Sequence, residues 1–185
     1  LPLGNATGIR KIVIDPGQAF GTGTHASTRL ALEWIDALAP ALEVGARVLD
    51  VGTGSGVLAL AAAALAPVNV VGFDLDPVAV SEARTNVERA RCADRVKLFS
   101  GGLEALAAPP FDLVVANLLS SEALPLLAGL AACTRPGGHA IFSGLLAAEI
   151  AGFSAALRAA GFTSLSVREF EDASGDRWAA ALTRR

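Results

Sequence analysis

The stretch that decides the fold is Arg47-Val48-Leu49-Asp50-Val51-Gly52-Thr53-Gly54-Ser55-Gly56. A short apolar run passes directly into three alternating glycines, and an alanine- and leucine-rich segment, residues 57–66, follows. This order is typical of a buried parallel strand, a tight turn and a helix that begins over the strand end. It predicts an α/β domain with a ligand site at the turn.

The same unit of strand and helix recurs along the chain. We expect further strands at residues 68–73, 95–99, 111–116 and 139–143, helices at 77–90, 121–133 and 147–160, and a turn at 135–138. Two last strands, 164–171 and 177–183, have no helix between them and should form an antiparallel hairpin at one edge. The pattern predicts one compact domain with a Rossmann-like, doubly wound, mostly parallel seven-stranded sheet.

A different piece precedes this domain. Residues 11–15 resemble a strand, the loop that follows is rich in glycine and threonine, and a helix is expected over 26–38. We therefore divide the chain into an N-terminal strand with a ligand-covering loop, residues 1–25, and a main domain, residues 26–185. The sequence contains no methionine, even at position 1, so we expect that a tag or an upstream substrate-recognition domain has been removed.

Composition excludes several classes of protein. With 15 basic against 18 acidic residues and a net charge of -3, the chain has no excess of basic residues for phosphate backbones, and we expect no direct nucleic-acid recognition. The longest apolar run, residues 57–66, is far shorter than the roughly 20 residues of a membrane span. Two cysteines and two histidines indicate neither a disulfide scaffold nor a metal site. The expectation is a soluble, cytoplasmic protein.

Two carboxylates indicate which ligand the turn binds. Asp74 ends the next strand, 22 positions after Gly52, where a carboxylate can accept the hydroxyls of a ribose. The glycines follow the spacing Gly-x-Gly-x-Gly, not the Gly-x-Gly-x-x-Gly of dinucleotide sites, and Asp50 would repel a pyrophosphate. A carboxylate suits the cationic amine of S-adenosyl-L-methionine. Asp50, Gly52, Gly54, Gly56 and Asp74 are therefore candidate cofactor residues, with a plain structural turn as the alternative.

Four segments together carry a resemblance to a known family. They are Asp15-Pro16-Gly17-Gln18-Ala19-Phe20-Gly21-Thr22-Gly23-Thr24-His25-Ala26-Ser27-Thr28, residues 48–56, residues 72–77, and Val115-Ala116-Asn117-Leu118-Leu119. With these segments the chain resembles the ribosomal protein L11 methyltransferase family over nearly its whole length. The first segment is more diagnostic than the glycine loop, which most class I methyltransferases share.

The resemblance implies an activity and a set of contacts. It implies S-adenosyl-L-methionine-dependent methylation of lysine side chains or of the N-terminal amine of a ribosomal protein L11-like substrate, with cofactor contacts at Thr28, Gly52, Asp74 and Asn117. Ser27 stands where threonine is usual, and Gln18 stands where an apolar residue is frequent. Family members also carry an N-terminal recognition domain, whereas this chain begins almost at the catalytic one.

Asn117 is the candidate catalytic residue. It ends the fourth expected strand, where its side-chain oxygen could accept a hydrogen bond from an incoming amine. Leu118, Leu119 and Ser120 follow it, and the chain has no tyrosine, whereas enzymes that methylate flipped bases place an aromatic ring there. An aliphatic amine is therefore favoured over a base. The alternative is that Asn117 merely caps the next helix.

The loop before the first long helix supplies the last candidates. Phe20, Thr24 and Thr28 are expected to cover or bind the cofactor. His25 is a conceivable base, but a histidine that holds its own backbone is favoured; Trp34 and Trp178 are expected in the core.

Three other functions remain open. A small-molecule N- or O-methyltransferase would use the same cofactor site. A module that binds the cofactor without chemistry, or a dehydrogenase, fits the sequence less well.

Overall fold

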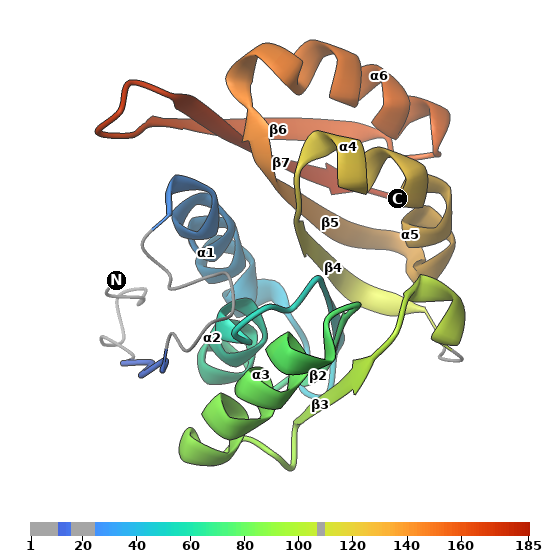
Figure 1. Ribbon diagram of the computed structural model, residues 1–185. Coiled ribbons are helices and arrows are strands. Elements are labelled where there is room, and N and C mark those ends of the chain that lie inside the picture. The colour runs from blue at the N-terminus through green and yellow to red at the C-terminus, as the bar shows by residue number, and fades with distance from the viewer. Residues whose placement is uncertain (1–10, 16–24, 107–109) are drawn as a thin grey trace.

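One sheet organises the residues that the structure describes, which are 11–15, 25–106 and 110–185 of the computed structural model (Figure 1). Its strands are β1 (Arg47–Val51), β2 (Asn69–Asp74), β3 (Val96–Ser100), β4 (Phe111–Asn117), β5 (Thr134–Leu146), β6 (Ser164–Glu171) and β7 (Arg177–Arg184). The α-helices are α1 (Ala26–Leu38), α2 (Val57–Leu65), α3 (Pro77–Arg89), α4 (Ser120–Ala123), α5 (Leu127–Cys133) and α6 (Ile150–Ala159). Short 3₁₀ turns are η1 (Ala39–Ala41), η2 (Leu103–Ala105), η3 (Leu124–Leu126) and η4 (Ala147–Glu149).

The strand order confirms the predicted doubly wound architecture. The order is β3-β2-β1-β4-β5-β7-β6, in which β1 to β5 are parallel and β7 pairs antiparallel with both β5 and β6. β1 pairs with β2 on one side and β4 on the other, so the chain reverses its direction of winding between β1 and β4. Ligands of open α/β sheets bind at the carboxyl ends of the strands at such a reversal.

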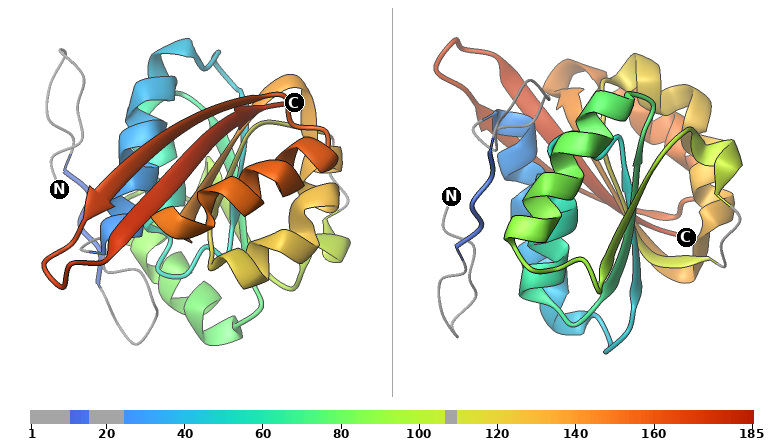
Figure 2. Two further views of the ribbon diagram at one scale, coloured as in Figure 1. Left: turned by 90° about the horizontal axis from the view of Figure 1, so that it is seen from above. Right: turned by 60° about the horizontal axis from the view of Figure 1, so that its bottom comes forward.

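Helices cover both faces of the sheet. α1, α2 and α3 lie on one face, and α4, α5 and α6 lie on the other (Figures 1 and 2). Side chains that alternate along β1 divide between the two cores: Val48 packs with the first helix layer, and Leu49 and Val51 pack with the second. Both faces of the central strands are therefore buried, which agrees with their continuous apolar sequence.

The turn expected at residues 135–138 is wrong, because this segment belongs to β5. Its backbone is paired with the end of β7: Gly137 N donates to Arg185 O at 2.7 Å, and Arg185 N donates to Gly138 O at 2.9 Å. Proline is tolerated in a strand near a bulge, and the register of β4 with β5 shifts between Phe111 and Leu113.

Two expected helices are shorter or interrupted. The helix predicted over 121–133 is divided into α4, η3 and α5, with Pro125 in the 3₁₀ turn between them. Proline lacks the backbone N–H that a continuous helix needs. The helix predicted over 147–160 begins with η4 and becomes α-helical only at Ile150.

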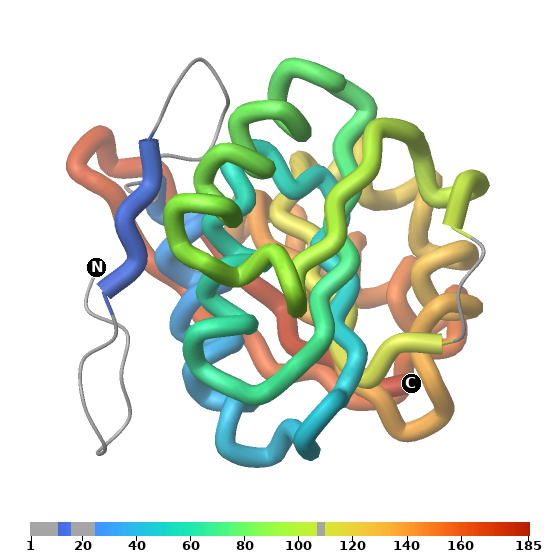
Figure 3. The backbone as a smooth tube through the Cα atoms, turned by 90° about the horizontal axis from the view of Figure 1, so that it is seen from below, coloured from blue at the N-terminus to red at the C-terminus, as the bar shows by residue number. Residues whose placement is uncertain are grey.

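Residues 11–15 run extended but form no strand, contrary to the prediction. Ile12 and Ile14 pack on the core beside the first helix layer, and the segment lies along α3 (Figure 3). The alternating pattern therefore reflects one buried face of an extended chain.

The C-terminal hairpin is bound to α1. Trp34 Nε1 donates to Ala180 O at 3.3 Å, and the Arg168 guanidinium lies 3.9 Å from the Trp34 ring centroid. A second cation–π contact places Arg29 of α1 4.4 Å from the centroid of the Phe170 ring. Trp34 is thus half-buried between helix and hairpin.

Within the described ranges, no helix is long and apolar enough to cross a membrane, and no group of three potential ligand side chains could hold a metal ion.

Gly144 in β5 allows a test of how this strand packs against Leu118, which follows β4. Its φ is +84°, and a Cβ would lie 2.5 Å from Leu118 O. We expect Gly144→Ala to lower the free energy of unfolding by about 2–4 kcal/mol, because it adds backbone strain to a clash with main-chain atoms. Denaturant unfolding measures this.

Gly152 is the matched control. It lies in α6, where an added Cβ would have no neighbour within 4 Å, so Gly152→Ala should raise stability by about 0.5–1 kcal/mol. Equal effects of the two substitutions would contradict the packing described.

Candidate active site

The glycine loop joins β1 to α2 at the point where the direction of winding of the chain reverses. Gly52, Gly54 and Gly56 all have positive φ, at +66°, +52° and +82°, a region that side chains other than glycine avoid. Thr53 N donates to Phe73 O at 2.9 Å, which fastens the loop to the end of β2. The backbone can therefore approach a ligand closely, next to the amides and the positive dipole end of α2.

Asp50 lies beneath this loop. It is 1% exposed, and its Oδ2 accepts hydrogen bonds from Thr53 Oγ1 at 2.7 Å and Ala59 N at 3.2 Å. Its Oδ1 is buried and has no hydrogen-bond partner among the described residues. Burial, reinforced by the nearby charge of Asp74, raises the pKa of this carboxyl to about 6 against the opposing hydrogen bonds.

Asp74 faces the other side of the loop. Its Oδ2 accepts from Gly54 N at 2.9 Å, and its Oδ1 accepts from Asp76 N at 3.0 Å. In the described part of the chain, no lysine or arginine pairs with Asp50 or Asp74. Two carboxylates at neighbouring strand ends without a cation form a negatively charged pair of acceptors that a positively charged ligand would neutralise.

Asn117 lies at the end of β4, on the other side of β1. Its Nδ2 donates to Thr28 Oγ1 at 3.3 Å, so its side-chain oxygen remains as the acceptor. The residue that caps α4 is Leu119, and the alternative that Asn117 caps the next helix is therefore wrong. The structure brings Asn117 and Thr28 together across 89 positions of sequence.

The start of α1 is fixed against the same edge of the sheet. Ser143 Oγ of β5 donates to Ser27 O at 2.7 Å, and Thr28 is 1% exposed. His25 caps the helix, since its Nδ1 accepts from Ser27 N at 3.2 Å. The favoured interpretation of His25 as a residue that holds its own backbone is thus confirmed.

His25 also contacts the C-terminal hairpin. Its ring packs edge-on against Trp178, with centroids 4.5 Å apart, and Trp178 Nε1 donates to Asp172 Oδ2 at 2.8 Å. Trp178 is therefore half-buried beside the start of α1, not in the core as expected.

The loops after β4 and β5 brace each other beside Asn117. Ser120 Oγ donates to Glu149 Oε1 at 2.5 Å, and Leu146 N donates to Glu149 Oε2 at 2.9 Å. The bond from Ser120, then that from Leu146, lowers the pKa of Glu149. The side chain of Leu118 lies against Gly52 of the glycine loop. A Cβ at position 52 would come within 2.7 Å of Leu118 Cδ2, so this position has no room for a side chain.

Sequence reasoning missed Ser143 and Glu149, and no local motif marks either one. Two predicted residues, Phe20 and Thr24, lie outside the described residues. The other candidates gather at one edge of the sheet: Thr28, Asp50, Gly52, Gly54, Gly56, Asp74 and Asn117.

Comparison with known proteins decides the family. A profile of the ribosomal protein L11 methyltransferase family matches residues 6–182. The chain belongs to the ribosomal protein L11 methyltransferase family. The resemblance of the sequence to this family is therefore confirmed.

Individual relatives agree with the assignment to the ribosomal protein L11 methyltransferase family. The family member of Symbiobacterium thermophilum is 42% identical over 171 residues, which are 92% of this chain and 53% of that protein. The member of Deinococcus radiodurans is 42% identical over 180 residues, 94% of this chain and 64% of that protein. The chain thus spans about half to two thirds of the length of these relatives.

A solved structure of a ribosomal protein L11 methylase from Lactobacillus delbrueckii subsp. bulgaricus has the same fold. It superposes with a TM-score of 0.78 at 31% identity and covers 94% of this chain and 85% of that one.

The raised pKa of Asp50 predicts how stability varies with pH. Because the folded state holds the proton more tightly than the unfolded state, the Asp50 contribution to stability is greatest below pH 4 and is lost as pH rises to about 6. We expect wild type to lose about 3 kcal/mol relative to Asp50→Asn over this range. Denaturant unfolding of both proteins from pH 4 to 7 measures the difference.

Parallel pH profiles of the two proteins would contradict the raised pKa. The comparison with Asp50→Asn cancels the titration of the other carboxyls, which are common to both proteins.

Proposed function

We propose that this protein is an S-adenosyl-L-methionine-dependent N-methyltransferase that acts on protein amines, with a ribosomal protein L11-like substrate. The observation that carries the proposal is the pair of uncompensated carboxylates, Asp50 and Asp74, on either side of the glycine loop. Family membership supports it.

The residues present fit this cofactor. The unpartnered Oδ1 of Asp50 and the uncompensated charge of the pair favour a ligand with a cationic amine. Asp74 would accept the ribose hydroxyls, and the glycine loop would admit the ligand close to its backbone. When bound, S-adenosyl-L-methionine supplies an electrophilic methyl group on a sulfonium. Phe20 and Thr24 stay predicted contacts.

Asn117 would orient the amine. Because its amide nitrogen donates to Thr28, its amide oxygen is held as an acceptor at the strand end. A hydrogen bond from the amine to this oxygen would direct the nitrogen lone pair. Positioning of both reactants together can supply about 7–11 kcal/mol of a reaction barrier, and this hydrogen bond would contribute a small part of it.

The amine must lose its proton before it reacts. For a free lysine, with a pKa of about 10.4, this costs about 4–5 kcal/mol near pH 7. The partly buried Leu118 and the exposed Leu119 follow Asn117, so an amine bound to Asn117 would meet apolar side chains, and an apolar environment lowers the pKa of an amine.

Protein amines are favoured over small molecules by the names of the relatives, which refer to ribosomal protein L11. Methylation of a small amine or hydroxyl with the same cofactor site is the second candidate. A turnover assay with labelled S-adenosyl-L-methionine, which offers ribosomal protein L11 beside a panel of small amines, separates the two. Label on the protein supports the proposal, and label only on a small molecule would overturn the substrate.

Asp74→Ala should weaken cofactor binding. Removal of a charged acceptor from the ribose hydroxyls is expected to cost about 2–3 kcal/mol, or about 30- to 150-fold in Kd. Isothermal titration with S-adenosyl-L-methionine measures it.

Asp76→Ala is the matched control, since Asp76 caps α3 through Val78 N. It should lower stability by about 1 kcal/mol and leave cofactor affinity within about twofold. An unchanged Kd in Asp74→Ala would show that the site is placed wrongly.

Asn117→Ala should lower turnover by about 10- to 100-fold while the cofactor Kd changes by less than about threefold, because the lost contact is to the amine. Steady-state kinetics together with titration separate the two effects. Asn69→Ala, at the amino end of β2 and so at the opposite end of the strands, is the control and should change neither quantity. Equal losses of turnover and affinity in Asn117→Ala would reassign Asn117 to the cofactor.

A further inference from the structure

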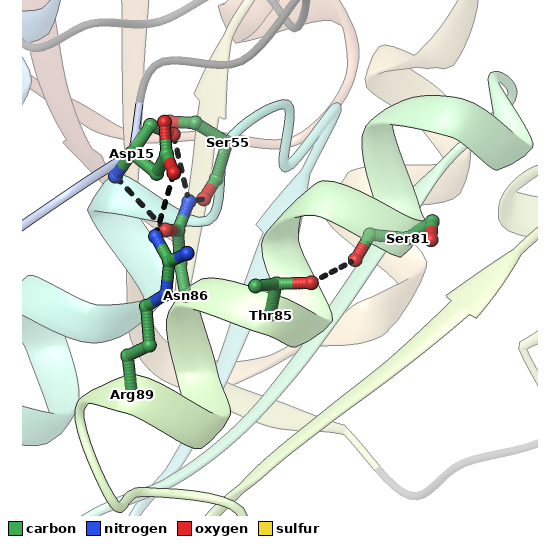
Figure 4. A network of polar contacts seen from close by, with 6 residues as sticks. All are labelled: Asp15, Ser55, Ser81, Thr85, Asn86 and Arg89. Atoms are coloured by element: carbon green, nitrogen blue, oxygen red, sulfur yellow. Dashed lines mark hydrogen bonds and ion pairs between the residues drawn. The ribbon is translucent and has the colours of Figure 1, made fainter.

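Asn86 is a buried polar residue in the last turn of α3. It is 1% exposed, although asparagine is a weak helix former and a polar side chain is costly to bury without partners. Figure 4 shows its amide between two segments that are distant in sequence, the extended residues 11–15 and the glycine loop.

The amide of Asn86 forms three hydrogen bonds to backbone groups. Its Oδ1 accepts from Asp15 N at 3.0 Å, and its Nδ2 donates to Asp15 O at 3.3 Å. The same Nδ2 donates to Ser55 O at 2.9 Å. One side chain thus binds Asp15 as a neighbouring strand would, and also binds the loop that follows β1.

The rest of the α3 surface supports the same contact. Ala83, one turn earlier, lies behind the glycine loop, and a Cβ at Gly56 would come within 3.2 Å of its Cβ. Arg89, one turn later, forms an ion pair with Asp15 at 2.7 Å, but both side chains are more than half exposed. An exposed pair contributes little, so the buried amide is the main connection.

The bond to Ser55 bears directly on the site. Ser55 lies between Gly54, whose N–H is bonded to Asp74, and Gly56, which caps α2. Glycines make this loop free to adopt many conformations. A fixed carbonyl at Ser55 restricts the loop to the conformation in which Gly54 N is bonded to Asp74 and Gly56 N to Thr53 O.

We infer that Asn86 is a positioning residue of the cofactor site, which holds the glycine loop and residues 11–15 in one fixed arrangement. This inference rests on the proposed function. It predicts that the loss of Asn86 weakens cofactor binding through the loop, although the side chain does not lie among the groups proposed to touch the cofactor.

The test compares Asn86→Ala with Thr85→Ala in the full chain. Thr85 is the adjacent residue of α3, and its hydroxyl donates only to Ser81 O of the same helix, at 3.2 Å (Figure 4). The Kd for S-adenosyl-L-methionine is measured by isothermal titration, and thermal melting of each variant sets a temperature at which all are folded. Asn86→Ala should raise Kd at least about tenfold, and Thr85→Ala should leave it within twofold.

A Kd within twofold of wild type in Asn86→Ala, with or without a lower melting temperature, would overturn the inference, because Asn86 would then serve stability alone. If Asn86→Ala does not fold, Asn86→Asp decides by the same threshold. It has nearly the same shape and keeps the acceptor for Asp15 N, but it loses both donations.

Amide hydrogen exchange distinguishes failure of this inference from failure of the proposed function. Exchange at Asp15 N should be faster in Asn86→Ala than in Thr85→Ala, with no cofactor present. If wild type does not bind S-adenosyl-L-methionine, the proposed function fails and the cofactor role of Asn86 fails with it. If wild type binds and the exchange rates do not differ, only the role of Asn86 is overturned.

Discussion

The buried carboxylate of Asp50 is the constraint on which the site depends. A charged group under the glycine loop is unfavourable unless hydrogen bonds surround it, and the Thr53 hydroxyl and Ala59 amide supply bonds to only one of its oxygens. Hydrogen bonds to Asp50 therefore hold the loop against the start of α2, while Oδ1 of Asp50 keeps no hydrogen-bond partner among the described residues. Such a site gains most from a ligand with a positive charge, and this gain is the physical basis of the function proposed for the edge between β1 and β4.

The sheet and most helices could be predicted because each depends on local pattern. Continuous apolar runs such as 47–51 specify buried strands, and Asp76 with Pro77 specifies the start of α3. The errors arose where remote contacts replaced the expected partners. Residues 135–138 have the composition of a turn but are paired by Arg185, and residues 11–15 alternate like a strand but are bound by a side chain.

The candidate site divides in the same way. Asp50, the glycines and Asp74 lie within 25 positions of one another and follow a recognisable spacing. Ser143, Glu149 and Asn86 reach the site from other elements through ordinary polar side chains, so no motif marks them. The contacts predicted for Phe20 and Thr24, and the division of the chain at residue 25, stay predictions. Supporting residues of this kind become visible only when the packing is known.

The attachment of α1 to the C-terminal hairpin has a consequence for synthesis of the chain. α1 emerges from the ribosome well before Ala180, Trp178 and the other hairpin groups that hold it. Until β7 has paired with β5, Trp34 of α1 and the edge of β5 both lack their partners in β7. Contacts between such distant residues form slowly, and exposed apolar surface in partly made chains favours aggregation. The nascent protein therefore completes the attachment of α1, which carries Thr28, only after β7 has been translated.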